Sequence, residues 1–251
     1  MLPARSILFW IACLFLSPLA AEQKISILAY HRFGPNAPER MTVSNRVFET
    51  HLKWLQQHGY AVIPMERAVK FLRGEEEIPL KSVVITVDDG HKSVYTDMAP
   101  LIRKYRVPVT LFIYPSAISN AKYAMTWDQL RELEATKYFS VESHTYWHPN
   151  FKIEKRRLPP AEYEKLVAGQ LGLSKSVLEK EMGHEVKYLA WAFGIHDLYL
   201  EAIAKKCGYT AAFSIGRRPA SAEEGMLGQP RFLMQNGDDA ARFETIVFNA
   251  N

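Results

Sequence analysis

Two short stretches of this sequence carry side chains suited to metal and proton chemistry. In TVDDG, Asp88 and Asp89 follow an apolar run, and in SHTYWHP, His144 and His148 stand four residues apart. Two imidazoles and one carboxylate make a three-ligand site for a divalent ion, with positions left open for water and substrate. That donor set is typical of catalytic rather than structural zinc.

Each stretch also has a purely structural interpretation. Asp-Gly is common turn chemistry, so the two carboxylates could simply end a strand in a turn. In the alternative, chemical interpretation, the two aspartates have different roles: one binds the metal and the other takes a proton. The two histidines could equally be surface or core residues. The preceding apolar run and Pro149 favour a loop, not a helix, for the histidine pair.

Short apolar runs recur along the chain, and each is bounded by polar or turn residues, as buried strands are. They are ISILAY (25–30), SVVITV (82–87), VPVTLFIY (107–114), YFSVES (138–143), VKYLAWAF (186–193) and YTAAFSI (209–215). Helical periods lie between them, for example over residues 47–60. Strands that alternate with helices predict parallel pairing in an α/β fold, either a barrel or a doubly wound sheet. Residues 151–160 interrupt this alternation of strands and helices and are predicted to form an exposed loop.

The polar residues of interest come directly after predicted strands. His31 follows the first run, the two aspartates follow the second, and His144 follows the fourth. Because the carboxyl ends of parallel strands meet on one face of such a fold, these side chains are expected to share one site. Taken alone, His31 would more often be a satisfied histidine at a strand end.

The beginning of the chain has the layout of a secretory signal peptide. Arg5 precedes an apolar run, and the small residues Ala20 and Ala21 stand before Glu22. The alternative is an uncleaved membrane anchor, but the run is short for a span. We therefore predict a signal peptide over residues 1–21 and export to the periplasm or cell surface.

Length and composition favour one domain after that segment. The chain has 251 residues, 48% of them hydrophobic, and residues 22–251 suit a single core. The net charge is +4, and the basic residues are distributed along the chain without a cluster, so the sequence does not indicate nucleic-acid binding. The mature chain has no further segment apolar enough to span a bilayer. Cys207 is its single cysteine, so no internal disulfide is expected.

In order and spacing, TVDDG and SHTYWHP resemble the first two motifs of the polysaccharide deacetylases, the NodB-homology group of carbohydrate esterase family 4. The resemblance extends over roughly residues 25–235. It implies a deformed (β/α) barrel and metal-dependent hydrolysis of N-acetyl groups. It also implies that Asp88 is the general base and that Asp89, His144 and His148 hold one divalent metal ion, with zinc favoured over cobalt, nickel or iron.

The chain departs from the family pattern in its third motif. Many relatives have an arginine where AWAFG has Ala190, so another residue must orient Asp88. Arg231 in QPRFLM is a candidate for that role or for substrate contact, and the alternative is a surface or structural arginine. A backbone N–H near Phe193 is expected, by the same resemblance, to hold the oxyanion.

The late histidine that supplies the acid in many relatives is also missing. One branch, the exported deacetylases of poly-β-1,6-N-acetyl-glucosamine, is similar in having a Tyr-His segment ahead of the Asp-Asp motif, an order that looks circularly permuted. This resemblance makes His31 the general acid, with His91 and His196 as alternatives. The remaining histidines fall on helical stretches and are expected to face solvent: His51, His58 and His184.

Aromatic residues near the motifs are expected to stack on sugar rings, or else to pack in the core. Those favoured are Tyr146, Trp147 and Trp127. The predicted function is removal of N-acetyl groups from a β-linked N-acetylglucosamine polysaccharide. Alternatives are a deacetylase of peptidoglycan, chitin-type oligomers or an O-acetylated glycan, and a catalytically weak carbohydrate-binding protein. The expected partners are the polysaccharide and an exopolysaccharide export machinery.

Overall fold

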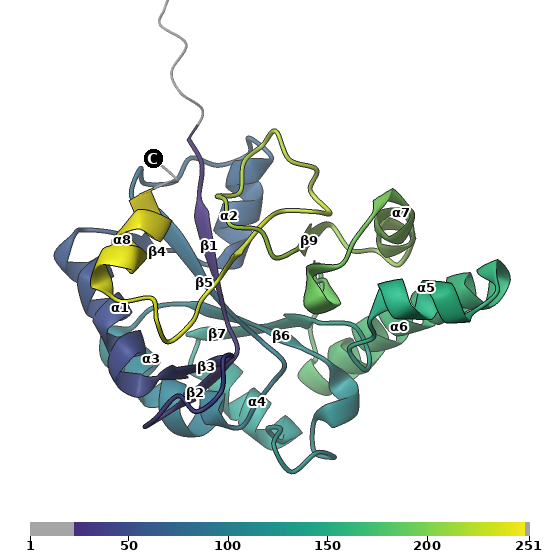
Figure 1. The fold of residues 1–251 in the computed structure, drawn as a ribbon, viewed down its shortest axis with the longest axis horizontal. Coiled ribbons are helices and arrows are strands. Elements are labelled where there is room, and N and C mark those ends of the chain that lie inside the picture. Colours follow the sequence, from purple (N-terminus) through teal and green to yellow (C-terminus); the bar gives the residue numbers. More distant parts are fainter. Residues whose placement is uncertain (1–22, 249–251) are drawn as a thin grey trace, which may run out of the picture.

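The computed structural model describes residues 23–248, which form one large curled parallel sheet surrounded by helices and one separate two-stranded sheet (Figure 1). The predicted signal peptide, residues 1–21, lies outside the described residues. The strands are β1 (Ser26–Tyr30), β2 (Arg32–Gly34), β3 (Thr42–Ser44), β4 (Ala61–Val62), β5 (Ser82–Asp88), β6 (Val109–Ile113), β7 (Phe139–Ser143), β8 (Tyr188–Ala190), β9 (Ala211–Phe213) and β10 (Phe232–Leu233).

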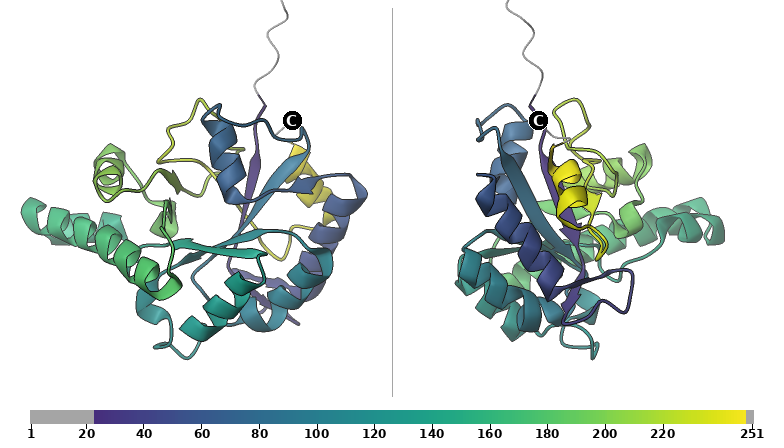
Figure 2. Two further views of the ribbon diagram at one scale, coloured as in Figure 1. Left: turned by 180° about the vertical axis from the view of Figure 1, so that it is seen from behind. Right: turned by 60° about the vertical axis from the view of Figure 1, so that its left-hand side comes forward.

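Helices connect the strands and cover the outside of the sheet (Figure 2). They are α1 (Asn45–Gln57), α2 (Met65–Leu72), α3 (Ala99–Tyr105), α4 (Trp127–Ala135), α5 (Phe151–Arg157), α6 (Pro160–Met182), α7 (Leu198–Lys206) and α8 (Ala240–Phe248). Three short turns of other helix types are η1 (Val94–Met98), η2 (Pro115–Ala117) and η3 (Ala192–Gly194). None of the helices within residues 23–248 combines the length and apolar character needed to cross a bilayer.

The main sheet has the strand order β10-β1-β5-β6-β7-β8-β9, with β4 added beside β5, and all of these pairings are parallel. Successive neighbours along β5, β6, β7, β8 and β9 are joined by helical crossovers, as predicted from the alternating pattern. The pairing brings the carboxyl ends of β1, β5, β6 and β7 side by side.

The segment of residues 226–233 runs between the two edges of the sheet and links them. On one side, the N–H groups of Ser214 and Gly216 donate to the carbonyls of Gln229 and Arg231 at 2.8 and 2.9 Å. On the other side, Phe232 pairs with Leu28 of β1. The sheet is therefore drawn round into a deformed barrel.

Strand side chains alternate between two hydrophobic clusters because successive residues of a strand point to opposite faces. Leu28, Ile85 and Leu111 belong to the larger cluster, which includes apolar residues of α1, α3, α4 and α6. Their chain neighbours, among them Ile27 and Phe112, belong to a second cluster with α2. Burial on both faces explains why the strands are almost continuously apolar.

Two expectations from the sequence are wrong. Residues 151–157 form α5 instead of an exposed loop, because the Asn150 side chain accepts the N–H of Ile153 at the helix start and Phe151 is fully buried. His51 does not face solvent. It is 1% exposed, accepts a hydrogen bond from the Tyr30 hydroxyl at 2.9 Å and donates to the Asp238 carbonyl.

Candidate active site

The two sequence motifs meet at the carboxyl ends of neighbouring strands. Asp88 is the last residue of β5 and Asp89 follows it, while His144 and His148 follow β7. Strand β6 pairs with both β5 and β7, so the motifs lie two strands apart. Asp89 and His148 both have left-handed backbones, with φ of 76° and 62°. Such conformations are costly for residues other than glycine and are concentrated at functional sites.

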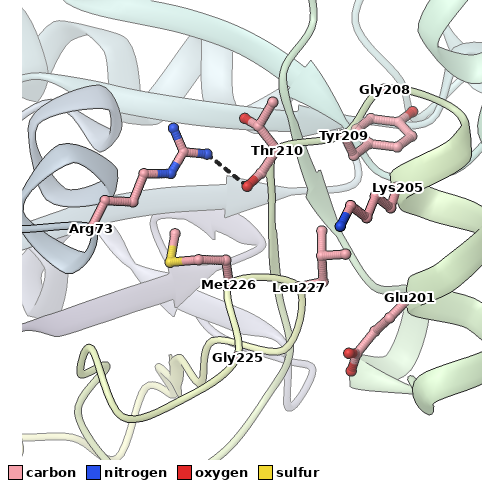
Figure 3. Close-up of a pocket in the computed structure, with 9 residues that line it drawn as sticks. All are labelled: Arg73, Glu201, Lys205, Gly208, Tyr209, Thr210, Gly225, Met226 and Leu227. Carbon is pink, nitrogen blue, oxygen red and sulfur yellow. Dashed lines mark hydrogen bonds between the residues drawn. The ribbon is translucent and has the colours of Figure 1, made fainter.

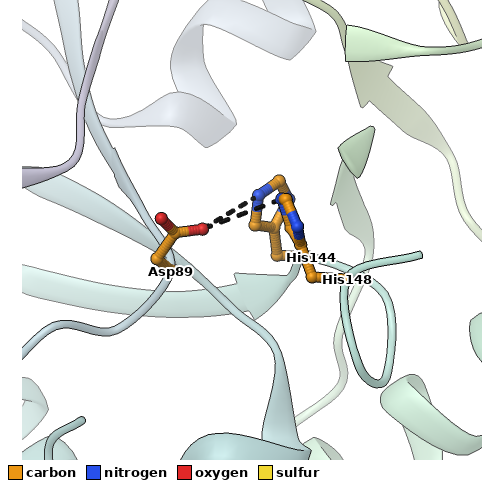
Figure 4. Close-up of side chains that lie close together, drawn as sticks. All are labelled: Asp89, His144 and His148. Atoms are coloured by element: carbon orange, nitrogen blue, oxygen red, sulfur yellow. Dashed lines mark ion pairs between the residues drawn. The ribbon is translucent and has the colours of Figure 1, made fainter. Parts of the chain in front are cut away.

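Asp89, His144 and His148 form a compact group of metal-type donors (Figure 4). One ligand atom from each lies within 4.8 Å of the others. The Oδ1 atom of Asp89 is 3.5 Å from Nε2 of His144 and 3.8 Å from Nε2 of His148. This Oδ1 atom is buried and has no hydrogen-bond partner among residues 23–248. An orphaned carboxylate oxygen facing two imidazoles fits a divalent cation.

The two histidines are supported differently. The Nδ1–H of His144 donates to the Ala190 carbonyl at 2.8 Å, which leaves Nε2 with its lone pair toward Asp89. His148 is held by its backbone, whose N–H donates to Thr145 Oγ1 at 3.2 Å. Its ring lies 4.5 Å from the ring of Phe193 and 5.6 Å from that of Tyr114, measured between centroids.

Arg231 lies against Asp88. Its Nη1 and Nη2 groups donate to the two carboxylate oxygens at 2.8 and 2.7 Å, and Nη1 also donates to Thr86 Oγ1 at 3.0 Å. Arg231 is 0% exposed and Asp88 is 1% exposed, so water does not screen the pair. The guanidinium faces the carboxylate, not the cavity. A bidentate contact of this kind fixes the carboxylate plane.

His31 shares one cavity with the motif residues. The cavity measures about 530 Å³, and its lining includes Asp88, Asp89, His144 and His148 as well as His31. The Nδ1 atom of His31 is buried and has no hydrogen-bond partner within the described chain.

The other candidate acids lie elsewhere. His91 lines a neighbouring hollow and contacts Ser93 Oγ at 2.8 Å through Nδ1. His196 donates from Nδ1 to Glu201 at 2.7 Å and stacks near Trp191. Of the three histidines considered as the acid, His31 is the one that lines the cavity.

The charges in the site shift one another's pKa values. Burial opposes ionisation of Asp88, but Arg231 and His144 hold the pKa of its carboxyl below the usual range. The pKa of Asp89 is likewise lowered, against burial, by His144 and His31. Burial lowers the pKa of His31, although both aspartates oppose this shift. Burial and the neighbouring His144 lower the pKa of His148 to about 4.

The aromatic candidates separate into two groups. Phe193 lies at the cavity rim, is 59% exposed and has a left-handed backbone with φ of 56°. Tyr146, Trp147 and Trp127 do not line the cavity, and Trp127 packs partly against the main hydrophobic cluster. Tyr114, at the end of β6, lines the cavity and was missed. Its position as the last residue of the predicted strand over residues 107–114 was the signal that could have found it.

A second hollow of about 490 Å³ lies away from these residues (Figure 3). Arg73 and Lys205 border it, and Arg73 donates to the Thr210 carbonyl at 2.8 Å. None of the predicted site residues lines this hollow. The motif residues and His31 therefore line the first cavity and not this second hollow.

Comparisons with known proteins agree with this geometry. A family model described as polysaccharide deacetylase matches residues 75–212. YxkH of Bacillus subtilis, whose name places it among the polysaccharide deacetylases, is 27% identical over 224 residues, covering 89% of this chain and 76% of YxkH. The poly-beta-1,6-N-acetyl-D-glucosamine N-deacetylase of Staphylococcus aureus is 26% identical over 211 residues, covering 82% of this chain and 71% of that protein.

The fold has also been seen in solved structures. Streptococcus pyogenes deacetylase PplD, in complex with acetate, superimposes with a TM-score of 0.80 at 21% identity, covering 90% of this chain and 99% of PplD. The predicted deformed (β/α) barrel is confirmed by this likeness and by the curled parallel sheet.

Proposed function

Because this chain belongs to the polysaccharide deacetylase family, we propose that it hydrolyses N-acetyl groups of a β-linked N-acetylglucosamine polymer of the poly-β-1,6 type. The family gives the reaction class, a hydrolase acting on an acetylated polysaccharide. The similarity to the Staphylococcus aureus enzyme supports the particular polymer. The observation that carries the proposal is the cavity shared by His31, Asp88 and the donor group of Asp89, His144 and His148.

In this proposal Asp89, His144 and His148 hold one divalent metal ion, with zinc as the first choice and cobalt, nickel or iron as alternatives. When bound, such an ion acts as a Lewis acid on the acetamide carbonyl. The buried oxygen of Asp89 and the free Nε2 of His144 support this assignment. The two histidines supply neutral donors and Asp89 the negative charge.

Asp88 acts as the general base. Its carboxylate takes a proton from the water that adds to the acetamide carbon. Arg231 keeps that carboxylate ionised and fixes its orientation through two hydrogen bonds. Arg231 thus takes the place of the arginine that is absent at Ala190.

His31 acts as the general acid. As the C–N bond breaks, its imidazolium gives a proton to the leaving amine, and acetate and a free amino sugar are released. Burial lowers the pKa of His31, but both aspartates oppose this shift and so favour the imidazolium that the acid role needs. In the same proposal a backbone N–H near Phe193, which lines the cavity, is the donor for the oxyanion.

The test is acetate release by the purified protein. Chelator-treated protein reloaded with Zn²⁺, Co²⁺ or Ni²⁺ is given β-1,6-linked N-acetylglucosamine oligomers, with chitin oligomers and O-acetylated glycan in parallel. We expect metal-dependent release that is fastest on the β-1,6 oligomers and is abolished by Asp88→Asn. Equal, slow release by wild type and Asp88→Asn would overturn the catalytic assignment, and faster release on another glycan would overturn the substrate.

His31→Ala is expected to lower turnover strongly while the metal content stays the same. His91→Ala and His196→Ala serve as matched controls, because both histidines lie outside the cavity lining. Undiminished turnover in His31→Ala would transfer the acid role to another residue.

We also propose that the chain is exported by the segment of residues 1–21 and works with an exopolysaccharide export machinery. Fractionation of cells that make the full-length chain, followed by N-terminal sequencing of the mature protein, tests the export. Protein that remains in the cytoplasm with its first residues intact would contradict it.

A further inference from the structure

The two candidate histidine ligands differ in what holds their rings. His144 is 2% exposed and its Nδ1–H is bound to a backbone carbonyl. The side chain of His148 is 22% exposed, and its ring nitrogens make no hydrogen bond within residues 23–248. Ligand histidines are ordinarily oriented by a hydrogen bond at the second ring nitrogen. Something else must orient His148.

Aromatic rings surround His148 instead. The Phe193 ring lies closest, with a centroid distance of 4.5 Å and an interplanar angle of 56°. The His144 ring lies at 4.7 Å and the Tyr114 ring at 5.6 Å. These tilted contacts are in the range of favourable aromatic pairs. Phe193 is itself 59% exposed, so the ring nearest to His148 belongs to a side chain that also contacts solvent.

The backbone around Phe193 is built to present this ring. Phe193 and Gly194 both have left-handed backbones, with φ of 56° and 68°. A Cβ atom at Gly194 would lie 2.7 Å from the backbone N of Ile215, so the turn packs directly on the chain leaving β9. Such close packing fixes the backbone from which the Phe193 side chain projects.

We propose that the Phe193 side chain is a positioning residue that keeps His148 in its ligating orientation and so controls the release of the bound metal. This inference rests on the metal site of the proposed function. It concerns the side chain and is independent of the backbone N–H at the same residue. His148 is then the first ligand to detach when the metal leaves, because its ring is held by ring contacts, the nearest with the exposed Phe193 side chain, and not by a hydrogen bond.

The experiment measures metal release without any glycan. Zinc-loaded protein is mixed with excess chelating indicator, and the dissociation rate is followed for wild type, Phe193→Ala, Phe193→Tyr and Trp147→Ala. We expect release roughly 10- to 100-fold faster in Phe193→Ala, the range typical for lost outer contacts of a metal ligand. Phe193→Tyr keeps the ring and should stay near wild type. Trp147→Ala removes an exposed aromatic side chain next to His148 in sequence and should also stay near wild type.

A second readout is the visible absorption spectrum of the Co²⁺-loaded protein, which should change in Phe193→Ala and not in the two controls. Release from Phe193→Ala at the wild-type rate would overturn the inference, and so would equally fast release from Phe193→Tyr. The metal site itself is checked first with His144→Ala. If wild type and His144→Ala retain equal metal, the proposed metal site fails together with this inference, whereas retained metal with unchanged release in Phe193→Ala refutes the inference alone.

Discussion

Replacing Arg231 with methionine should destabilise the metal-free protein by several kcal/mol, because it leaves the buried Asp88 carboxylate without its partner. The pair is bidentate, with distances of 2.8 and 2.7 Å, and both residues are at most 1% exposed. Breaking such a pair by removing one member typically costs about 3–5 kcal/mol. The cost has a ceiling, since Asp88 can take up a proton instead of remaining a buried, unpaired carboxylate.

The expected loss depends on pH in a defined direction. In wild type, Arg231 lowers the pKa of Asp88, so this pair stabilises the fold above the unfolded pKa and the contribution disappears as the pH falls through the folded pKa. In Arg231→Met the pKa of Asp88 is raised, so the variant loses further stability as the pH rises. The difference between the two proteins should therefore be larger at pH 8 than at pH 5.

The assay is urea unfolding, followed by tryptophan fluorescence in the presence of chelator at several pH values. In a thermal melt of the same proteins, a loss of 3–5 kcal/mol for a chain of this size corresponds to a melting temperature lower by roughly 6–20 °C. Arg217→Met is the matched control, because Arg217 is exposed and should change stability by less than about 0.5 kcal/mol. The double variant Asp88→Asn/Arg231→Met should lose less than the sum of the two single variants. A loss below about 0.5 kcal/mol in Arg231→Met, or strict additivity, would refute the reasoning.

Three further predictions concern other parts of the fold. Burial raises the pKa of Glu142 to about 8, so its contribution to stability is present below the unfolded pKa and is lost as the pH rises through 8. Relative to Glu142→Gln, wild type should lose stability between pH 6 and 9 in urea titrations, and parallel curves would contradict this. Gly194→Ala should destabilise the protein by about 1–3 kcal/mol and impair metal retention, because of its left-handed backbone and the contact with Ile215. Its control is Gly169→Ala, in the interior of α6, where a Cβ atom meets no other atom; this variant should stabilise the protein by about 0.5–1 kcal/mol. Thermal melting should show a lower melting temperature for Gly194→Ala and a higher one for Gly169→Ala. His51→Ala should cost about 1–3 kcal/mol in the same melts, because the Tyr30 hydroxyl and the Asp238 carbonyl lose their partner, and an unchanged melting temperature would contradict this.

Strand ends and short motifs were predictable because their signals are local. Asp88, Asp89 and His144 each follow an apolar run, and parallel pairing alone is enough to bring such positions to one face. Tyr114 satisfies the same rule after β6. His51 was wrongly expected to face solvent, although the spacing of apolar residues predicts its burial. With Phe48, Leu52 and Leu55 it occupies the i, i+3, i+4, i+7 positions of α1 that face the core.

The contact between Arg231 and Asp88 could not be predicted with the same security. The two residues are separated by 143 positions, and no periodic pattern around Arg231 indicates where its chain runs. Its position follows from the closure of the sheet by residues 226–233, which depends on backbone pairing at both edges. Helix α5 was missed for a related reason. Its charged residues suggest a loop. The helix depends on the Asn150 cap, a local signal that was overlooked, and on the tertiary burial of Phe151.

The sheet closure also sets the order in which the site is completed during synthesis. Chains are made from the N-terminus, and contacts between distant residues form late. A nascent chain that ends at residue 225 already contains Asp88 and the donor group of Asp89, His144 and His148, but it lacks Arg231. The carboxylate of β5 therefore lacks its buried arginine partner until nearly the whole polypeptide has emerged, so the last part of the chain to be synthesised determines when this site acquires its final charge.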